Sequence, residues 1–342
     1  DMIILPGGEP GSTNLEKNFS LANNSYNTTW SEIDVSCEAC HGPGSKHVSM
    51  ANSLSESELN NSPTKGLAID FNSAVAGSWI FKDDENIASL STKKNTDLLI
   101  ETCGRCHSRR STIDSKETYS KSLLDTHLIS LLEPGLYHAD GQINEEVYVY
   151  GSFIQSKMYT AGVNCNNCHD PHSLNLRAEG NTLCLQCHKP EVYDHQSHHF
   201  HLAGTNASEC VSCHMPAKNF MVVDSRRDHS FRIPRPDLSI KTGSPNACNQ
   251  CHMDQSPEWA VASIQERYKK DTFDFHFGEA LHAARTAAID SEDLLLRVIN
   301  DEQQSVIARA SALNELGRYL SQASIQSVLN ALSSDEPLIR SA

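Results

Sequence analysis

The stretch Cys165-Asn166-Asn167-Cys168-His169 decides the fold, because its Cys-x-x-Cys-His pattern occurs five more times along the 342 residues. The pattern uses all twelve cysteines, so none is left for another role. The cysteine pairs are Cys37 and Cys40, Cys103 and Cys106, Cys165 and Cys168, Cys184 and Cys187, Cys210 and Cys213, and Cys248 and Cys251. The histidines that close the motifs are His41, His107, His169, His188, His214 and His252.

The spacing of this pattern suits a porphyrin. Two thiols one helical turn apart can bond the two vinyl groups of one haem, while the imidazole of the next residue lies beneath the iron. Each motif is therefore typical of a c-type haem site, and the sequence predicts six covalent haem c groups. Paired cysteines also build zinc sites, but zinc gives no reason for a histidine directly after every pair. A disulfide framework is disfavoured, because twelve cysteines in 342 residues are far sparser than in small stapled domains.

The composition predicts a fold organised by these haems. Only 38% of the residues are hydrophobic and 6% aromatic. The 216 residues from Cys37 to His252 hold six motifs, one for every 36 residues, and buried porphyrins can supply the missing apolar mass. We expect a mainly α-helical fold with short helices and much irregular chain. Residues 145–153 favour a short strand through their β-branched and aromatic content, or else an extended loop on a haem edge.

The charge and the ends of the chain bear on partners and location. A formal charge of −15, from 43 acidic and 28 basic residues, disfavours nucleic acid as a partner. It favours a basic redox protein, although an acidic surface also serves solubility alone. No apolar run reaches the length of a membrane span. The start, Asp1–Pro6, lacks the features of a signal peptide, so we expect a mature, trimmed or incomplete chain. Covalent haem attachment implies export, to the periplasm or the outside of the cell.

The character of the sequence changes at residue 259, where the cysteines have ended and helical periodicity becomes clear. We therefore expect two domains, a hexahaem domain over 1–258 and a helical segment over 259–342. The periodicity predicts helices at 259–269, 275–289, 291–300, 305–320 and 324–333.

Part of this helical segment repeats. Val306–Leu313 is echoed by Pro337–Ala342, with Arg309 and Arg340 offset by 31 residues. A period near 30 with paired helices predicts a short α-solenoid of the HEAT kind. The last repeat stops where its second helix should begin, so we expect further chain beyond Ala342 or a partner covering this end. The alternative is an ordinary helical cap on the haem domain.

Eleven histidines lie outside the motifs, more than six irons need for a second axial imidazole each. We therefore expect mostly bis-histidine ligation. The favoured second ligands are His47, His138, His172, His198, His199, His201 and His229. The remaining candidates are His127, His195, His276 and His282.

Local context sharpens some of these predictions. His47 and His172 follow motif histidines after short turns, so each is expected to reach a neighbouring haem. The alternative for both is a hydrogen bond that stabilises the turn. The cluster His198–His201 is expected to supply one or two ligands, while its other members bond propionates or carbonyls.

His229 stands in an arginine-rich stretch. Its neighbours are Arg226, Arg227, Arg232 and Arg235. Guanidinium groups bind carboxylates through paired hydrogen bonds, so this setting suits an axial histidine beside haem propionates.

Longer stretches carry a family resemblance. They are Val35–Gly44, Gly135–Ile143, Gly162–Ser173, His198–His201, Cys213–Pro216 and Arg226–Pro236. In these stretches the chain resembles multihaem cytochromes c whose haem domain is followed by HEAT or tetratricopeptide-like repeats, and the resemblance spans nearly the whole chain. Family members carry a further haem motif before a Ser-Thr-Asn-Leu stretch, whereas here Ser12–Leu15 follows Gly7–Gly11. The resemblance implies electron transfer more directly than any one reaction.

Three functions compete. The pattern favours electron transfer through six bis-histidine haems, with the helical repeats as a docking surface and, as a variant, a homo-oligomer or filament. The alternative is an oxidoreductase acting on a small nitrogen or sulfur species at an open iron. No motif replaces its histidine by lysine, the sign of a nitrite-reductase-like haem. A scaffold stapled by haems is disfavoured, because six redox cofactors exceed what stapling needs.

Overall fold

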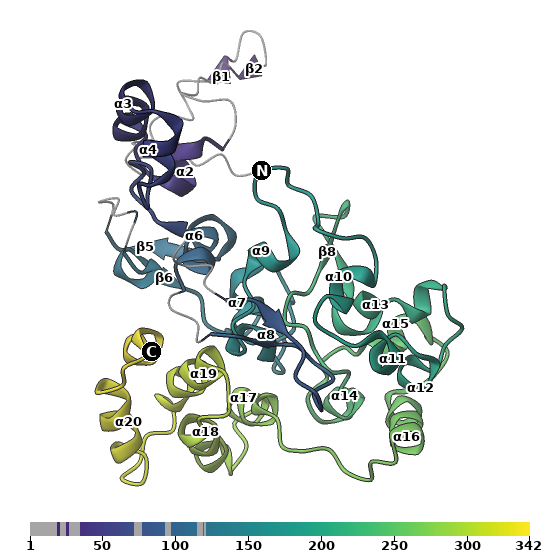
Figure 1. Cartoon of the computed structure of the whole chain (residues 1–342). Coiled ribbons are helices and arrows are strands. Elements are labelled where there is room, and N and C mark those ends of the chain that lie inside the picture. The colour runs from purple at the N-terminus through teal and green to yellow at the C-terminus, as the bar shows by residue number, and fades with distance from the viewer. Residues whose placement is uncertain are drawn as a thin grey trace. The chain divides into compact units, whose positions relative to one another are not determined.

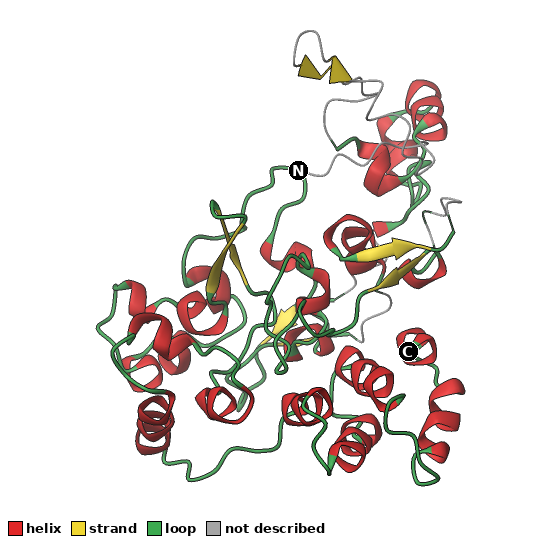
Figure 2. Cartoon of the chain, turned by 180° about the vertical axis from the view of Figure 1, so that it is seen from behind, coloured by secondary structure: helices red, strands yellow, loops and turns green. Residues whose placement is uncertain are grey.

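The computed structural model describes residues 35–71, 77–92, 97–114, 119 and 121–342, together with the backbone of 19–20 and 25–26. The chain divides into two compact units, Asp1–Asp70 and Phe71–Ala342. In the described parts of both, short helices are joined by irregular chain, and strands occur in antiparallel pairs (Figure 1, Figure 2). This confirms the prediction of a mainly helical fold with much irregular chain.

The first unit carries one motif. Its described elements are β1 (Phe19–Ser20), β2 (Ser25–Tyr26), α2 (Cys37–His41), α3 (Ser45–Ser53) and α4 (Glu56–Asn60). Gly42 ends α2 with a φ of 73°, a conformation that favours glycine. A capping box between Ser55 and Glu58 begins α4. The motif helix is thus one isolated turn, bounded on its C-terminal side by a glycine.

The second unit carries the other five motifs on short elements. Up to the last motif these are β3 (Trp79–Ile80), β4 (Ser89–Leu90), α6 (Leu98–His107), β5 (Arg110–Thr112), η1 (Leu123–Asp125), β6 (His127–Ile129), α7 (Tyr150–Phe153), α8 (Lys157–Thr160), α9 (Cys165–Cys168), α10 (Thr182–Leu185), α11 (Pro190–Tyr193), α12 (Gln196–His199), η2 (Asn206–Ser208), α13 (Cys210–His214), β7 (Ala217–Phe220), β8 (Asp224–Arg227), α14 (Pro236–Thr242) and α15 (Ala247–Cys251). The strands pair as β3 with β4, β5 with β6, and β7 with β8.

Residues 145–153, all of them described, do not form the strand considered from the sequence. Tyr150–Phe153 form α7, and Tyr148 makes an isolated bridge to Ser108. The φ of Tyr148 is 60°, which interrupts the extended backbone that a strand needs. The apolar side chains serve the core instead, since Val147 and Phe153 are buried.

The C-terminal helices lie close to where the periodicity predicts them. They are α16 (Pro257–Tyr268), α17 (Phe277–Arg285), α18 (Ser291–Asn300), α19 (Val306–Leu316), α20 (Ile325–Leu332) and α21 (Pro337–Ser341). The first five confirm the predicted helices, with α17 and α19 shorter at their ends. Helices α17, α18 and α19 pack on one another, α19 packs on α21, and α18 packs on α20.

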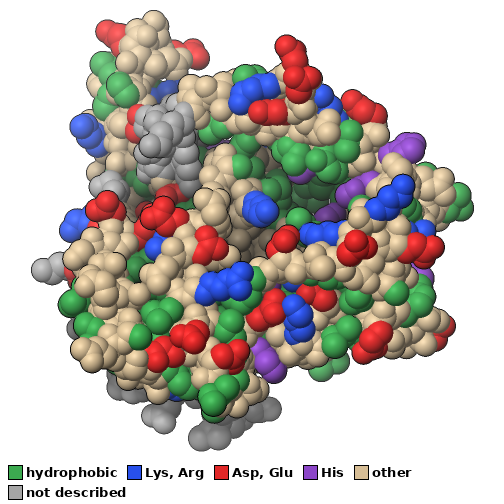
Figure 3. Space-filling model, turned by 90° about the horizontal axis from the view of Figure 1, so that it is seen from below, with side chains coloured by type: hydrophobic (Ala, Val, Ile, Leu, Met, Phe, Trp, Pro, Cys, Tyr) green, Lys and Arg blue, Asp and Glu red, His purple; other side chains and the backbone are tan. Residues whose placement is uncertain are grey.

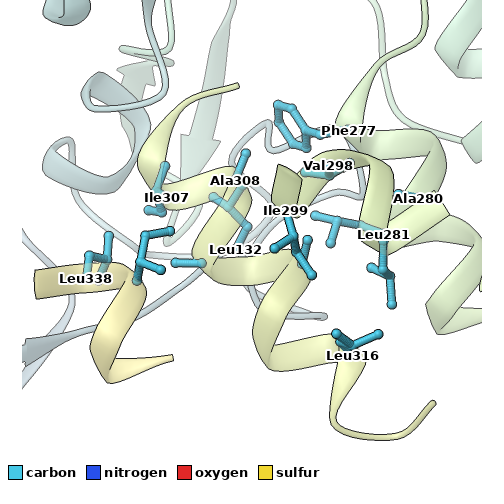
Figure 4. Close-up of a cluster of buried hydrophobic side chains, with 14 of the residues drawn as sticks. Leu132, Phe277, Ala280, Leu281, Val298, Ile299, Ile307, Ala308, Leu316 and Leu338 are labelled. Atoms are coloured by element: carbon cyan, nitrogen blue, oxygen red, sulfur yellow. The ribbon is translucent and has the colours of Figure 1, made fainter. Parts of the chain in front are cut away.

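Helices α17 to α21 share one core with residues 123–154 (Figure 4). Leu132 is buried there, and its backbone N–H donates to the Ser311 hydroxyl at 2.9 Å. Its carbonyl accepts from Arg285, which also pairs with Glu315 at 3.3 Å. Side chains of α17 and α19 therefore satisfy both backbone groups of this buried residue. The shared core crosses the predicted domain boundary at 258/259, which stays a prediction.

Candidate haem sites

Each motif lies on or beside one helical turn, and we number the sites 1 to 6 in chain order. Site 1 lies on α2, site 2 ends α6, site 3 lies on α9, site 4 spans α10 and the turn after it, and sites 5 and 6 lie on α13 and α15. Asparagine begins two of these helices: Asn164 accepts from the N–H of Asn166 at 3.0 Å, and Asn246 from that of Asn249 at 3.1 Å. Such a turn presents both thiols of a motif to one porphyrin.

None of the twelve cysteines, all of them described, forms a disulfide, and each is exposed or half-buried. Thiols of different sites touch. Cys103 of site 2 donates a hydrogen bond to Cys165 of site 3, which lowers the pKa of Cys165 and raises that of Cys103. Cys210 of site 5 donates likewise to Cys184 of site 4, with the same directions of pKa for acceptor and donor. Neighbouring attachment sites therefore adjoin.

Packing of the motif helices agrees with these contacts. Helix α6 of site 2 packs on α9 of site 3, and α13 of site 5 packs on α15 of site 6. The Asn181 side chain beside site 4 accepts from the N–H of Cys210 at 2.9 Å. The same amide donates to the carbonyl of Ser208 at 3.1 Å. Asn181 thereby ties the start of site 4 to the start of site 5.

Three motif histidines each face a second histidine. The ring centres are 6.5 Å apart for His169 and His229, 6.1 Å for His214 and His198, and 6.2 Å for His252 and His201. The angles between the ring planes are 23°, 13° and 33° in the same order.

These separations fit an iron between two imidazoles. Metal–nitrogen bonds of about 2.0–2.1 Å on opposite sides of one ion, with roughly 1.2 Å from each nitrogen to its ring centre, place the centres roughly 6.4 Å apart. Offset stacking of aromatic rings spans about 4.5–7 Å, so the separation points to a metal only together with the hydrogen bonds of the rings.

The hydrogen bonds of three of these rings leave Nε2 able to bind a metal. In each, Nδ1 donates to a backbone carbonyl, so the proton is on Nδ1 and Nε2 keeps its lone pair. The bonds run from His201 to the carbonyl of His199, from His214 to that of Arg232 at 2.6 Å, and from His229 to that of Arg227 at 3.0 Å.

Burial also favours the neutral, metal-binding form of three histidines in these pairs. It lowers the pKa of His169, His198 and His229. Neutral imidazole is the form that binds a metal, so a lowered pKa keeps these rings available for ligation near neutral pH.

The cluster 198–201 separates into distinct roles. His199 accepts the N–H of His201 on its Nδ1 at 3.1 Å, which places its proton on Nε2 and disfavours metal binding through that atom. Phe200 has a φ of 58° and ends α12 in the left-handed region. This turn lets His198 face site 5 while His201 faces site 6.

The other favoured histidines are not part of these pairs. His47 is half-buried, and its Nδ1 donates to the carbonyl of Lys65 at 2.7 Å, the same pattern as in the paired rings. His138 is half-buried, and burial lowers its pKa. His172 is exposed on the turn after site 3, where its N–H donates to Asp170 at 3.4 Å.

The remaining candidates have structural surroundings of their own. His195 and His276 act as N-caps of α12 and α17, accepting on Nδ1 at 3.2 Å and 3.0 Å. His127 is bonded to a neighbouring threonine hydroxyl at 2.8 Å, and burial lowers its pKa to about 4. His282 lies on α17.

Aromatic side chains beside the sites were missed by the sequence reasoning. Tyr193 packs edge-on against His188 at 5.2 Å and against His198 at 5.5 Å, and so lies between sites 4 and 5. Trp259 packs against His252 at 4.9 Å. Both follow a motif histidine by five to seven residues, a short spacing that could have drawn attention to them.

The arginines around His229 are partly engaged by protein carboxylates. Arg226 pairs with Glu146 and, at 2.5 Å, with Asp224. Arg235 pairs with Asp237 at 2.7 Å. Two of the four guanidinium groups expected to meet propionates therefore already have acidic partners.

One face of the molecule is hollowed, and histidine side chains gather with hydrophobic ones at the hollow (Figure 3). Within the described ranges, no three side chains among His, Cys, Asp and Glu converge as a zinc site requires. A search of the described helices for one long and apolar enough to cross a membrane finds none.

Comparison with known proteins supports haem binding. Residues 158–192 match the family described as "Doubled CXXCH motif", and this range holds sites 3 and 4. The chain thus contains the doubled motif that this family model describes. The crystal structure of the outer cell wall cytochrome OcwA is similar at a TM-score of 0.43 and 15% identity, over 91% of this chain and 71% of that one. No curated protein matches the chain.

Proposed function

We propose that this protein is a multihaem cytochrome c that transfers electrons through six haem c groups, one at each site, most of them held by two histidines. Bound haem supplies reversible one-electron transfer. The histidine pairs at sites 3, 5 and 6 carry the proposal. In each pair the distance between the ring centres fits one iron between them, and each pair includes the histidine of a different motif. Histidines on both sides leave no position for a substrate, which suits an electron carrier.

Three second ligands are assigned on this basis: His229 at site 3, His198 at site 5 and His201 at site 6. His199 is assigned to the hydrogen bonding of its cluster. His47, His138 and His172 remain the candidates for the other sites. The Nδ1 bond from His47 to the Lys65 carbonyl supports it among the three.

The attachment sites of the second unit form an unbranched series in chain order. Thiol contacts join site 2 to site 3 and site 4 to site 5. Sites 3 and 4 share the doubled motif, and the packing of α13 on α15 joins site 5 to site 6. Such a series keeps successive cofactors close, as transfer along a chain requires.

The helical segment is proposed to be a short HEAT-like solenoid. Arg309 donates to the carbonyl of Ile299 near the end of α18 at 3.0 Å. Arg340 donates to the carbonyl of Ser334, just after α20, at 2.5 Å. The two arginines that echo one another in sequence thus both bond the end of the preceding helix, which supports a structural repeat.

The wider setting follows from the chemistry of attachment and from charge. We propose an exported protein of the periplasm or cell exterior that exchanges electrons with redox proteins as donor and acceptor. Self-association, as a homo-oligomer or a filament, belongs to the same proposal. The division into a hexahaem domain over 1–258 and a helical segment over 259–342 is retained as its domain plan.

Haem counting and electron paramagnetic resonance test this function. Mass spectrometry of the purified chain should give six covalent haems, and the oxidised protein should show low-spin signals indifferent to nitrite, hydroxylamine and cyanide. A high-spin signal that shifts on ligand addition would instead support a reductase or oxidase of small nitrogen or sulfur species.

One observation favours that second function at site 4. Like His41 and His107, His188 lies outside the three histidine pairs of the described residues, and the edge of Tyr193 packs against its ring at 5.2 Å. An iron held by His188 alone would keep one axial position open. Cyanide titration separates the two functions, because an open iron at site 4 binds cyanide and one held by two histidines does not. A His188→Met variant identifies which haem signal belongs to site 4.

A further inference from the structure

The tip of the β7–β8 hairpin is apolar and exposed. Met221, Val222 and Val223 are 84%, 88% and 87% exposed. They connect two antiparallel strands whose last pair is Phe220 with Asp224. Single exposed apolar residues are common on protein surfaces, but three in succession at a turn mark an interaction site.

The backbone of this tip is costly for these residues. Met221 has a φ of 47° and Val222 a φ of 73°, both in the left-handed region. Side chains branched at Cβ are rare there, and short hairpin turns usually contain Gly, Asn or Asp. A valine kept in this conformation points to a need for an apolar side chain at the tip, because stability alone would favour Asn or Gly.

The hairpin is basic within an acidic protein. Residues 217–227 contain Lys218, Arg226, Arg227 and one acid, Asp224, and so carry a formal charge of +2, which falls to +1 when Glu146, the other partner of Arg226, is counted. The chain outside residues 217–227, from a total of −15, therefore carries −17. An apolar tip on a basic stem fits an apolar surface with an acidic border.

Such a surface lies on α20 of the same unit. Ile325, Leu329 and Leu332 are 53%, 52% and 63% exposed, and their spacing places them on one face of the helix. Residues 319–339 contain no lysine or arginine, and Asp335 and Glu336 follow the helix after two serines. Before it, the Glu292 carboxylate accepts from the Ser321 hydroxyl at 2.7 Å. Acidic groups thus border the apolar face of α20 at both ends.

We propose that the β7–β8 hairpin of one copy of this chain docks on the α20 face of a second copy, with Met221–Val223 against Ile325, Leu329 and Leu332. The proposal names the interface of the self-association proposed above and does not depend on which histidines bind iron. Because the hairpin tip and the α20 face are different surfaces, a dimer joined by one contact still has a free tip on one copy and a free α20 face on the other. Further copies can therefore add head to tail. The small tip places the contact in the weak, salt-sensitive class.

Complementation between two variants tests this contact in the haem-loaded protein. Val222→Asn removes the apolar tip and suits the left-handed backbone, while Leu329→Gln makes the α20 face polar. Leu174→Asn is the matched control, since Leu174 is 83% exposed with a φ of 61° on a different loop. Sedimentation velocity over a concentration series, at low and high salt, reports the assembly.

The expected pattern is specific to head-to-tail docking. Wild type and Leu174→Asn should form a growing series of oligomers that high salt dissolves. Each test variant alone should weaken association about tenfold, the effect of burying one such side chain. Their mixture should give a one-to-one dimer, since each supplies the surface that the other lacks.

Three results would overturn the proposal. They are a monomeric wild type at every concentration, oligomers unaffected by either variant, and a mixture that stays monomeric although wild type associates. A changed haem spectrum in Val222→Asn would also overturn it, because the tip would then cover a haem of its own chain. Failure of the proposed ligation by two histidines would appear separately, as a high-spin signal in the paramagnetic resonance spectrum.

Discussion

Replacement of His198 by alanine is the sharpest test of the ligand assignment, and His199→Ala is its matched control. The two residues are adjacent on α12, yet the ring of His198 faces the motif histidine His214 at 6.1 Å. His199 instead holds the N–H of His201 on its Nδ1 at 3.1 Å. The assignment therefore predicts opposite outcomes for neighbouring histidines.

The size of the effect follows from the number of motifs. Loss of His198 opens one axial position among six haems, so one sixth of the low-spin haem should become high-spin. His199→Ala removes one hydrogen bond of about 1 kcal/mol and should leave the spin state of every haem unchanged. His198→Met, which restores a ligand, should return the site to low spin at a higher potential.

Quantitative paramagnetic resonance of the oxidised proteins measures this fraction, with haem content fixed by the absorbance of the reduced protein. Cyanide should convert the new high-spin haem of His198→Ala to low spin and leave the control unaffected. The reasoning from ring separation and tautomer would be refuted if one sixth of the haem became high-spin in His199→Ala while the spin state in His198→Ala stayed unchanged.

Three further predictions address other parts of the molecule. His229→Met should keep all haems low-spin and raise one midpoint potential by roughly 0.1 V, a fraction of the about 0.8 V that axial ligands span; an unchanged redox titration would exclude His229 as a ligand. Ser311→Ala leaves the buried N–H of Leu132 without its acceptor and should cost about 1–3 kcal/mol in urea unfolding. If the haem-binding part and the C-terminal helices share one core, the urea midpoints measured by far-ultraviolet circular dichroism and by haem absorbance should fall together. A lower midpoint by circular dichroism alone would contradict a shared core. Burial lowers the pKa of His276 well below its unfolded value of about 6.5, so the unfolded state binds more protons and stability should fall as the pH drops below about 6.5. His276→Asn keeps an N-cap residue and should flatten this pH dependence, whereas an unchanged slope would assign it to other groups.

The sequence predicted what local chemistry determines. The Cys-x-x-Cys-His spacing needs only one helical turn, so the short motif helices could be expected from it, while the roles of their cysteines and histidines in haem attachment stay a prediction. The five C-terminal helices were also predictable, because their apolar positions repeat with the helical period. The strand at 145–153 failed because a left-handed Tyr148 interrupts it, and nothing in the residue type signals that φ.

The pairing of histidines was beyond local reasoning. His229 meets His169 across 60 residues, and the contact depends on how the β7–β8 hairpin returns the chain. The choice between His198 and His199 depends on which atom of each ring faces a donor or an acceptor. Such information exists only once the backbone around both rings is placed.

The segment from His188 to His201 explains why three sites should behave as one unit. It begins with the proximal histidine of site 4, and Tyr193 then lies between that ring and His198. In the proposed ligation His198 serves site 5 and His201 serves site 6, so two second ligands precede the motifs they complete. The ligation of sites 5 and 6 therefore depends on the conformation of a segment that also packs beside site 4. A distortion here should change the potentials of three haems together, whereas one at His229 should change mainly that of site 3.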